Sequence, residues 1–231
     1  MKTIGLLGGM SWESTIPYYQ TINTVVKAKL GGYHSARCIL YSVDFQEIET
    51  CQSIGDWETS AKILSAAALK LQAAGADFLI LCTNTMHKVA DTIESCLTIP
   101  LLHIADLTIE ELQKQNYHQV ALLGTKYTME QDFYKRRLID QGLEVMVPDA
   151  DERNFINDTI YQELCLGTIS PVSKRHFLDI VDTLAEQGAQ AVILGCTEIG
   201  LLFTQADTSV PLFDTTLIHA QKAAEYALKE L

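Results

Sequence analysis

One cysteine of the chain stands in a setting that is typical of acid–base chemistry. Cys196 follows a short apolar run directly and belongs to the segment 195–198, which reads GCTE. Where a buried strand turns into a helix, backbone N–H groups point at the first side chains and lower the pKa of a thiol from its ordinary value of about 8.5. A thiol with a lowered pKa can take up a proton as thiolate and give it back as thiol. We therefore expect a lowered pKa for Cys196.

A second polar segment, residues 83–87 (TNTMH), occupies the equivalent place in an earlier part of the chain. Three pairs of segments recur in the same order: 4–8 with 120–124, 75–81 with 188–194, and 100–101 with 211–212, at offsets of 116, 113 and 111 residues. A single pair could match only because buried parallel strands look alike, but three collinear pairs indicate two similar halves. When the alignment of the second pair is extended beyond the strands, Thr83 takes the position in the first half that Cys196 takes in the second.

The elements that must hold these segments are readable from the apolar pattern. Short apolar runs alternate with longer amphipathic stretches closed by glycine, which predicts βα units and mostly parallel sheets. We expect strands at residues 3–7, 38–43 and 78–81, and helices that end near Gly31, Gly75, Gly142, Gly167 and Gly188. Ser14 is the predicted N-cap of the first helix, and Thr128 with Gln131 is predicted to form a capping box.

The fold class predicted from this pattern is α/β, with two similar domains related by a pseudo-twofold. The first domain is expected to comprise residues 1–103 plus 212–231, because the chain must return after the second half, and the second domain residues 104–211. Open α/β sheets bind ligands beyond the carboxyl ends of their strands. The active site is therefore expected in the cleft between the two domains.

Composition limits the partners of the chain. With 48% hydrophobic and 20% charged residues the chain is globular, and its formal net charge of −12 repels nucleic acid. The sequence has neither the pattern of a signal peptide nor an apolar run of membrane-spanning length, so we expect a cytoplasmic protein without a membrane partner. Six cysteines without a CxxC pair, and histidines without ligand spacing, predict no metal site. A homodimer is left open.

The motifs resemble those of the aspartate/glutamate racemase family. The second signature of that family, Gly-Cys-Thr-Glu, stands at residues 195–198, and its first, Cys-Asn-Thr-x-His, at 83–87 with threonine in the thiol position. Residues 5–10 (GLLGGM) and 122–125 (LLGT) also match, so the resemblance covers essentially the whole chain. It implies racemisation of an amino acid, aspartate or glutamate first, without metal or pyridoxal phosphate. By this resemblance Cys196 deprotonates the L-substrate, and Thr83 is the second catalytic residue.

Racemisation needs a base on one face of Cα, an acid on the other, and groups that stabilise negative charge as it grows toward an enediolate. Asn84, Thr85, Thr125 and Thr197 are expected to bind the α-carboxylate. Further substrate-binding residues are expected to be Met10, which lines the cleft or packs in the core, and Gln52. Supporting roles are expected for His87, as an anchor of its turn, and for Glu198, as a group that orients Cys196 or caps a helix.

The sequence departs from the family at two places. A threonine hydroxyl is too weak an acid to rest as an alkoxide, so Thr83 can return a proton, directly or through a water, but cannot replace a thiolate base. Cys82 is an alternative, although strand alternation directs it to the opposite face. The basic residues with which relatives hold acidic substrates are missing from 46–53 and 161–165, where Gln52 is a neutral replacement.

Two other functions fit the same residues. A single thiol that protonates a carbanion would suit a decarboxylase of a malonate-type acid, which needs no opposing base. A chain that binds an amino acid without turnover would be a sensor. Release of CO2 distinguishes the first of these from a racemase, and the absence of exchange at Cα distinguishes the second.

Overall fold

The computed structural model describes residues 1–229, which form two compact α/β units. Unit 1 comprises Met1–Ile104 together with the segment from His219 onward, and unit 2 comprises Ala105–Ile218. Each unit contains one sheet of four strands, and every strand pair in both sheets is parallel. The predicted α/β class with two parallel sheets is thus confirmed.

Unit 1 has the strand order β2-β1-β3-β4. The two central strands, β1 and β3, are buried along their whole length, which explains why they read as unbroken apolar runs. The elements in chain order are β1 (Ile4–Gly8), α1 (Trp12–Leu30), β2 (Cys38–Ser42), α2 (Phe45–Ile54), α3 (Trp57–Ala73), β3 (Phe78–Leu81), the 3-10 helix η1 (Thr85–Val89), α4 (Ala90–Ser95) and β4 (Leu101–Leu102).

Unit 2 repeats this order as β6-β5-β7-β8. The chain enters the unit through α5 and leaves it through α11, whose later turns belong to unit 1. The elements are α5 (Ile104–Lys114), β5 (Gln119–Gly124), α6 (Lys126–Glu130), α7 (Asp132–Asp140), β6 (Glu144–Met146), α8 (Ala150–Gln162), η2 (Leu164–Leu166), α9 (Pro171–Glu186), β7 (Ala191–Gly195), α10 (Ile199–Leu202), η3 (Gln205–Asp207), β8 (Leu212–Asp214) and α11 (Thr215–Leu228).

The two sheets have the same register as well as the same strand order. In unit 1 Leu79 pairs with Leu101, and in unit 2 Val192 pairs with Leu212. The offsets of 113 and 111 residues found in the sequence carry the first pair onto the second. The internal duplication therefore repeats the pairing of strands, and equivalent residues of the two units can be compared one by one.

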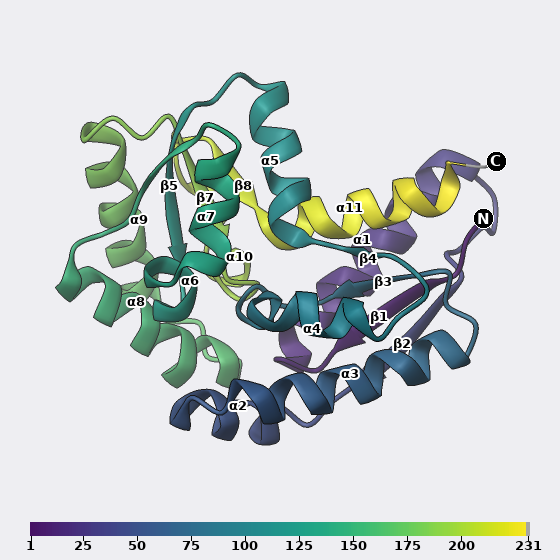
Figure 1. Cartoon of the computed structure of the whole chain (residues 1–231). Coiled ribbons are helices and arrows are strands. Elements are labelled where there is room, and N and C mark those ends of the chain that lie inside the picture. The colour runs from purple at the N-terminus through teal and green to yellow at the C-terminus, as the bar shows by residue number, and fades with distance from the viewer. Residues whose placement is uncertain (230–231) are drawn as a thin grey trace. The chain divides into compact units, whose positions relative to one another are not determined.

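Helices cover both faces of the sheet in unit 1 (Figure 1). On one face, alanines of α11 and the buried residues Tyr18 and Ile22 of α1 pack on Ile4 and Phe78. On the other face, α3 and α4 pack on side chains of alternate parity along β1 and β3. Lysines close the last turn of α1, where they complement the helix dipole.

In unit 2 the residues of β5 alternate in the same way. Ala121 and Leu123 belong to a large apolar cluster with α8, α9 and α10, and the buried Val120 and Leu122 have the opposite parity. α7 contacts the edge strand β6, and its Arg137 forms an ion pair of 3.0 Å with Asp106 of α5. The core of each unit is therefore a sheet between two helix layers (Figure 1).

Two predicted helix starts are wrong. The N-cap of α1 is Ser11, whose hydroxyl accepts from the backbone N–H of Ser14, so Ser14 already lies inside the helix. The expected capping box of Thr128 and Gln131 does not form, because Thr125 caps α6 by accepting from the N–H of Thr128. In both cases a hydroxyl three residues earlier satisfies the first free N–H groups of the helix.

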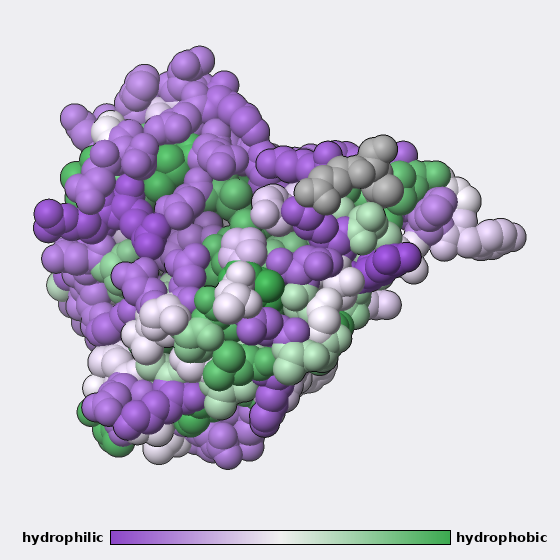
Figure 2. Space-filling view, turned by 45° about the vertical axis from the view of Figure 1, so that its right-hand side comes forward, coloured by the Kyte–Doolittle hydropathy of each residue, from purple (hydrophilic) through white to green (hydrophobic). Residues whose placement is uncertain are grey.

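The surface shown in Figure 2 carries apolar residues in small groups among polar ones. Trp12, with 61% of its surface exposed, Ile16 and Tyr19 recur at helical spacing on the outer side of α1. None of the helices within residues 1–229 is both long and apolar enough to cross a lipid bilayer.

Candidate active site

The carboxyl end of β7 is built on a close approach between two strands. Gly124 of β5 pairs with Gly195 of β7, and a Cβ added to Gly124 would lie 2.7 Å from the Gly195 carbonyl oxygen. A Cβ added to Gly195 would lie 2.8 Å from the carbonyl oxygen of Leu123. Glycine is therefore required at both positions, and the turn that follows (residues 195–198, the second turn) begins at a fixed place.

Within the second turn, the thiol of Cys196 meets a buried carboxyl group. Cys196 Sγ donates to Glu198 Oε2 over 3.0 Å, and Thr197 Oγ1 donates to the same oxygen over 2.7 Å. All three side chains are buried. A carboxyl oxygen that accepts from a thiol is also the nearest acceptor for the thiol proton, so the pair can pass a proton between sulfur and oxygen.

The pKa of the Cys196 thiol is raised well above its ordinary value, first by burial, then by the negative charge of Glu198 and of Cys165. The expectation of a lowered pKa is therefore wrong for this structure. The backbone N–H of Glu198 does point at the sulfur and lowers the pKa, but this is the smallest of the contributions. In the resting protein Cys196 is a protonated thiol.

Two ionisable side chains to which the sequence assigns no role in the site, Tyr161 and Cys165, lie near Cys196. Tyr161 lies near the end of α8 and Cys165 in η2, one helical turn later, and η2 contacts α10. Burial raises the pKa of Tyr161, and so do the charges of Cys196, Cys165, Tyr127 and Glu198. The spacing of four residues between Tyr161 and Cys165 was the signal in the sequence that could have placed both on one side of the turn.

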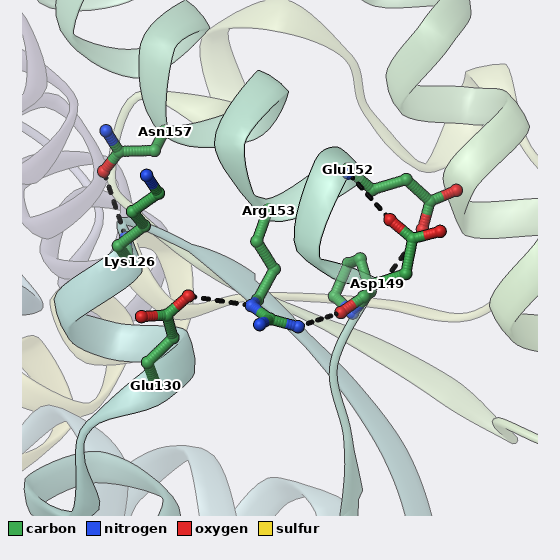
Figure 3. A network of polar contacts seen from close by, with 7 residues as sticks. Lys126, Glu130, Asp149, Glu152, Arg153 and Asn157 are labelled. Atoms are coloured by element: carbon green, nitrogen blue, oxygen red, sulfur yellow. Dashed lines mark hydrogen bonds and ion pairs between the residues drawn. The ribbon is translucent and has the colours of Figure 1, made fainter.

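A polar network fixes α8 relative to the end of β5 (Figure 3). Arg153 of α8 donates to Glu130 of α6 over 2.9 Å and to the carbonyl of Pro148 over 2.7 Å. The Lys126 N–H, directly after the capping residue Thr125, donates to Asn157 Oδ1 over 3.1 Å. Asp149 and Glu152 close the start of α8 with a capping box. The network thus holds Thr125, expected to bind substrate, to the helix that carries Tyr161.

The carboxyl end of β3 carries the other predicted motif. Thr83, Asn84 and Thr85 are buried, and with Met86 and His87 they form the turn between β3 and the body of η1 (residues 83–87, the first turn). No acidic or thiol side chain stands among these five residues. Thr83, Asn84 and Thr85 offer hydroxyl and amide groups, which can donate hydrogen bonds or relay a proton but do not ionise near neutral pH.

Of the two other predicted substrate-binding residues, Gln52 contacts the first turn, whereas Met10 is buried in the apolar core. Gln52 is a buried residue of α2 whose Nε2 donates to Met86 Sδ over 2.9 Å. Met10 is buried in the apolar cluster that includes Leu7 and Leu81. The structure therefore brings Gln52 together with the predicted motif and places Met10 among packing residues.

His87 connects the first turn to the end of β4. Its Nδ1 lies 2.7 Å from the carbonyl oxygen of Thr83, and its Nε2 accepts from the Ile104 N–H over 3.2 Å. Both ring nitrogens are thus engaged with the backbone of unit 1. The role of His87 as an anchor of the turn stays a prediction.

Cys82 is a packing residue. It belongs to the cluster formed by α1, α11 and the sheet, and burial raises the pKa of its thiol far above the ordinary value. Its neighbours in that cluster are Phe78 and Ile80, which share its strand parity. Within residues 1–229, no three His, Cys, Asp or Glu side chains are grouped so that they could hold a metal ion.

Both units contain a four-stranded parallel sheet, and in unit 2 the turn after β7 holds a thiol beside a carboxyl group. The model of the Asp/Glu/Hydantoin racemase family matches residues 7–223. The chain belongs to the Asp/Glu/Hydantoin racemase family, which confirms the predicted resemblance, and its class of activity is amino-acid racemisation.

The chain is similar to a named racemase in sequence and to two crystal structures in fold. The broad specificity amino-acid racemase RacX of Bacillus subtilis (strain 168) is 26% identical over 219 residues, which cover 92% of each chain. A crystal structure from Yersinia pestis, provisionally named an Asp/Glu racemase, is 57% identical with a TM-score of 0.91 and covers 99% of this chain and 100% of its own. An aspartate racemase homologue from Pyrococcus horikoshii OT3 is 38% identical, with a TM-score of 0.85 and coverage of 99% and 100%.

Proposed function

We propose that the chain racemises an amino acid, aspartate or glutamate first, through thiol acid–base chemistry that needs no cofactor. The observation that carries the proposal is the hydrogen bond of 3.0 Å from Cys196 Sγ to Glu198 Oε2. It joins a thiol to a proton acceptor within the GCTE motif, at the carboxyl end of a strand where α/β sheets bind ligands.

The first step uses this pair. Cys196 passes its proton to Glu198 and becomes a thiolate, and the thiolate removes the proton from Cα of the L-substrate. The electron pair of the C–H bond moves into the α-carboxylate, which becomes an enediolate. Thr197, whose hydroxyl donates to the same carboxyl oxygen, keeps Glu198 oriented toward the sulfur. The carboxyl group thus supplies the acceptor that a thiol with a raised pKa requires.

The second step returns a proton to the opposite face of Cα. Thr83 delivers that proton, directly or from a water that it holds, and yields the D-enantiomer. The donor regains a proton from solvent in the same event, because a threonine alkoxide does not persist, and Glu198 releases the former thiol proton to solvent. Cys196, which now carries the Cα proton, is again a thiol. Asn84 and Thr85 of the first turn, with Thr125 and Thr197 of unit 2, stabilise the enediolate by hydrogen bonds. Gln52 is the neutral group beside the first turn that contacts the substrate side chain.

The proposal is tested by following the loss of the Cα proton in D2O by NMR across a panel of L- and D-amino acids. Cys196→Ser is expected to lower exchange by at least about 10³-fold, because a general acid or base typically contributes 10²- to 10⁴-fold. Cys96→Ser, which removes an exposed thiol far along the chain from the motif, is the matched control and keeps full activity. Undiminished exchange in a folded Cys196→Ser variant contradicts the proposal.

The same samples distinguish the other two functions. Release of CO2 from a malonate-type acid, without exchange at Cα of any amino acid, indicates the decarboxylase. A rise in melting temperature with an amino acid, again without exchange, indicates a sensor. Cα exchange that depends on Cys196 excludes both.

A further inference from the structure

Three buried histidines of unit 1 are gathered beneath the first turn. The ring centroids of His87 and His103 are 4.4 Å apart, and those of His87 and His219 are 5.9 Å apart. His219 Nε2 lies 2.9 Å from the Leu102 carbonyl, and its Nδ1 lies 3.0 Å from the hydroxyl of Tyr18. The chemistry proposed above uses none of these rings, so their place in the fold requires an explanation.

The hydrogen bonds of His87 fix where its proton sits. A backbone N–H can only donate, so the nitrogen that faces Ile104, Nε2, is an acceptor. A carbonyl oxygen can only accept, so the nitrogen that faces Thr83, Nδ1, carries the proton. His87 is thus a neutral ring that donates at one end and accepts at the other.

The bridge acts on the residue that the proposed reaction needs. It ties the Thr83 carbonyl, at the end of β3, to the Ile104 N–H, which follows β4, so two neighbouring strand ends are held at one distance by a rigid ring. The backbone of Thr83 carries the hydroxyl that must reach one face of Cα. Fixing its carbonyl therefore restricts where that hydroxyl can lie.

Unit 2 builds the same turn without such a bridge. The offset of 113 residues places Ile199 at the position of Met86, and both are fully buried in the core of their unit. The next position is His87 in unit 1 and Gly200 in unit 2, which has no side chain to bridge with.

The position of His103 corresponds in unit 2 to Asp214, at the offset of 111 residues. A Cβ on Gly200 would meet the Asp214 carboxyl, so the two positions are neighbours in both units. Since the fold forms around a glycine there, the imidazole is not needed to form the turn.

We propose that His87 is a positioning residue for racemisation, a neutral imidazole bridge between the Thr83 carbonyl and the Ile104 amide that holds Thr83 at the face of Cα where the proton is returned. This inference rests on the proposed function. It assigns His87 no proton transfer, because both of its nitrogens are engaged with the backbone.

Deprotonation of an L-substrate at Cα can have two outcomes, and His87 is proposed to affect only one of them. Once Cys196 has removed the proton from an L-substrate, a solvent deuteron can return on the same side, which is exchange with retention. It can also arrive from the side of Thr83, which is inversion. A misplaced Thr83 slows inversion only, so the ratio of retention to inversion increases while Cys196 continues to work.

The test measures that ratio in D2O by NMR together with chiral analysis of the product. His87→Leu removes both hydrogen bonds and is expected to raise the ratio about tenfold or more, because a misplacement of about 1 Å can cost about 10²-fold in rate. His87→Gln, whose amide can donate and accept, is expected to return the ratio to within about threefold of the wild type. The control, His176→Leu, removes an imidazole of unit 2 that stacks on Phe155 of α8 and leaves the ratio unchanged.

A second readout does not depend on turnover. In ¹⁵N spectra His87 of the wild type is expected to show a protonated Nδ1 and an unprotonated Nε2, and His87→Leu is expected to shift and broaden the Thr83 signals but not those of Cys196. The opposite tautomer, an unchanged ratio in folded His87→Leu, or a His87→Gln variant that behaves like His87→Leu overturns the inference. If the wild type exchanges no Cα proton, the proposed function has failed, and the spectra alone decide whether His87 holds Thr83.

Discussion

The carboxyl ends of β3 and β7 have the same backbone frame and opposite side-chain chemistry. At β7 a thiol, a glutamate, a tyrosine and a second cysteine lie close enough to change one another's pKa, and glycine stands at position 200. At β3 the polar groups are hydroxyls and amides, with a neutral imidazole at position 87. The duplicated fold therefore supplies the positions of these side chains but not their chemistry. In the proposed reaction the turn after β7 removes the Cα proton, and the turn after β3 positions the hydroxyl that returns it.

The largest expected effect comes from removing the acceptor at β7. Glu198→Gln keeps the size and a hydrogen-bond acceptor but cannot take the thiol proton, so Cα exchange of an L-substrate is expected to fall by about 10³-fold. In the variant burial still raises the pKa of Cys196, and no carboxylate is left to take its proton, so the thiolate must form by loss of the proton to solvent. The exchange rate of the variant should therefore increase with pH. Exchange at the wild-type rate near neutral pH would show that Glu198 is not the acceptor.

The next largest effect is a loss of unfolding free energy at low pH, caused by the buried His219 of unit 1. Burial lowers the pKa of His219 from 6.5 to about 4, so below pH 6.5 the unfolded chain binds a proton that the folded chain does not. This contribution is complete above pH 6.5 and is lost as the pH falls, by about 3 kcal/mol at pH 4. Urea unfolding at pH 7 and pH 4 measures it. His219→Gln, which does not titrate, should lose less stability over the same interval, and an equal loss refutes the prediction.

A smaller effect is expected from making the two ends alike. Thr83→Cys gives the first turn a group that can act as a base, and kcat for a D-substrate is expected to increase about tenfold, more than kcat for the L-substrate. The ratio of the two kcat/KM values is fixed by the equilibrium, so the asymmetry appears in kcat and KM separately. Equal wild-type kcat values for the enantiomers, with no gain in Thr83→Cys, would show that Thr83 does not limit the reaction.

The smallest effect is expected at Cys82, the residue beside Thr83 that packs in the core. Cys82→Ala removes one buried sulfur and should cost about 1 kcal/mol of unfolding free energy, while racemisation remains unchanged. Thermal unfolding and the exchange assay, run on the same preparation, check both statements. A loss of racemisation at unchanged stability would make Cys82 the second base.

Local patterns predicted most of the frame. The offset between residues 75–81 and 188–194 anticipated a register that both sheets share, because strand pairing repeats whenever the apolar pattern repeats. The first helix was predicted to begin at Ser14, whereas its cap is Ser11, since several hydroxyls near a helix start can compete for the same N–H groups.

The chemistry of the site depended on contacts that the pattern does not contain. The pKa of Cys196 was expected to fall, and it rises because burial and Glu198 outweigh the turn amide. The partner of His87 at Ile104 lies 17 residues later and is reached only through β4. The sequence predicts which groups stand at a strand end, but burial and long-range contacts decide their protonation.

Because α11 completes unit 1, the two units can finish folding in the opposite order to that in which their first strands are translated. The alanines of α11 cover one face of the sheet in unit 1, where they pack with Ile4, Leu6, Phe78 and Ile80. Unit 2 is one continuous stretch of chain, Ala105–Ile218, which is translated before the body of α11. On the ribosome unit 2 can therefore finish folding before unit 1, whose sheet keeps one apolar face uncovered until α11 has been translated.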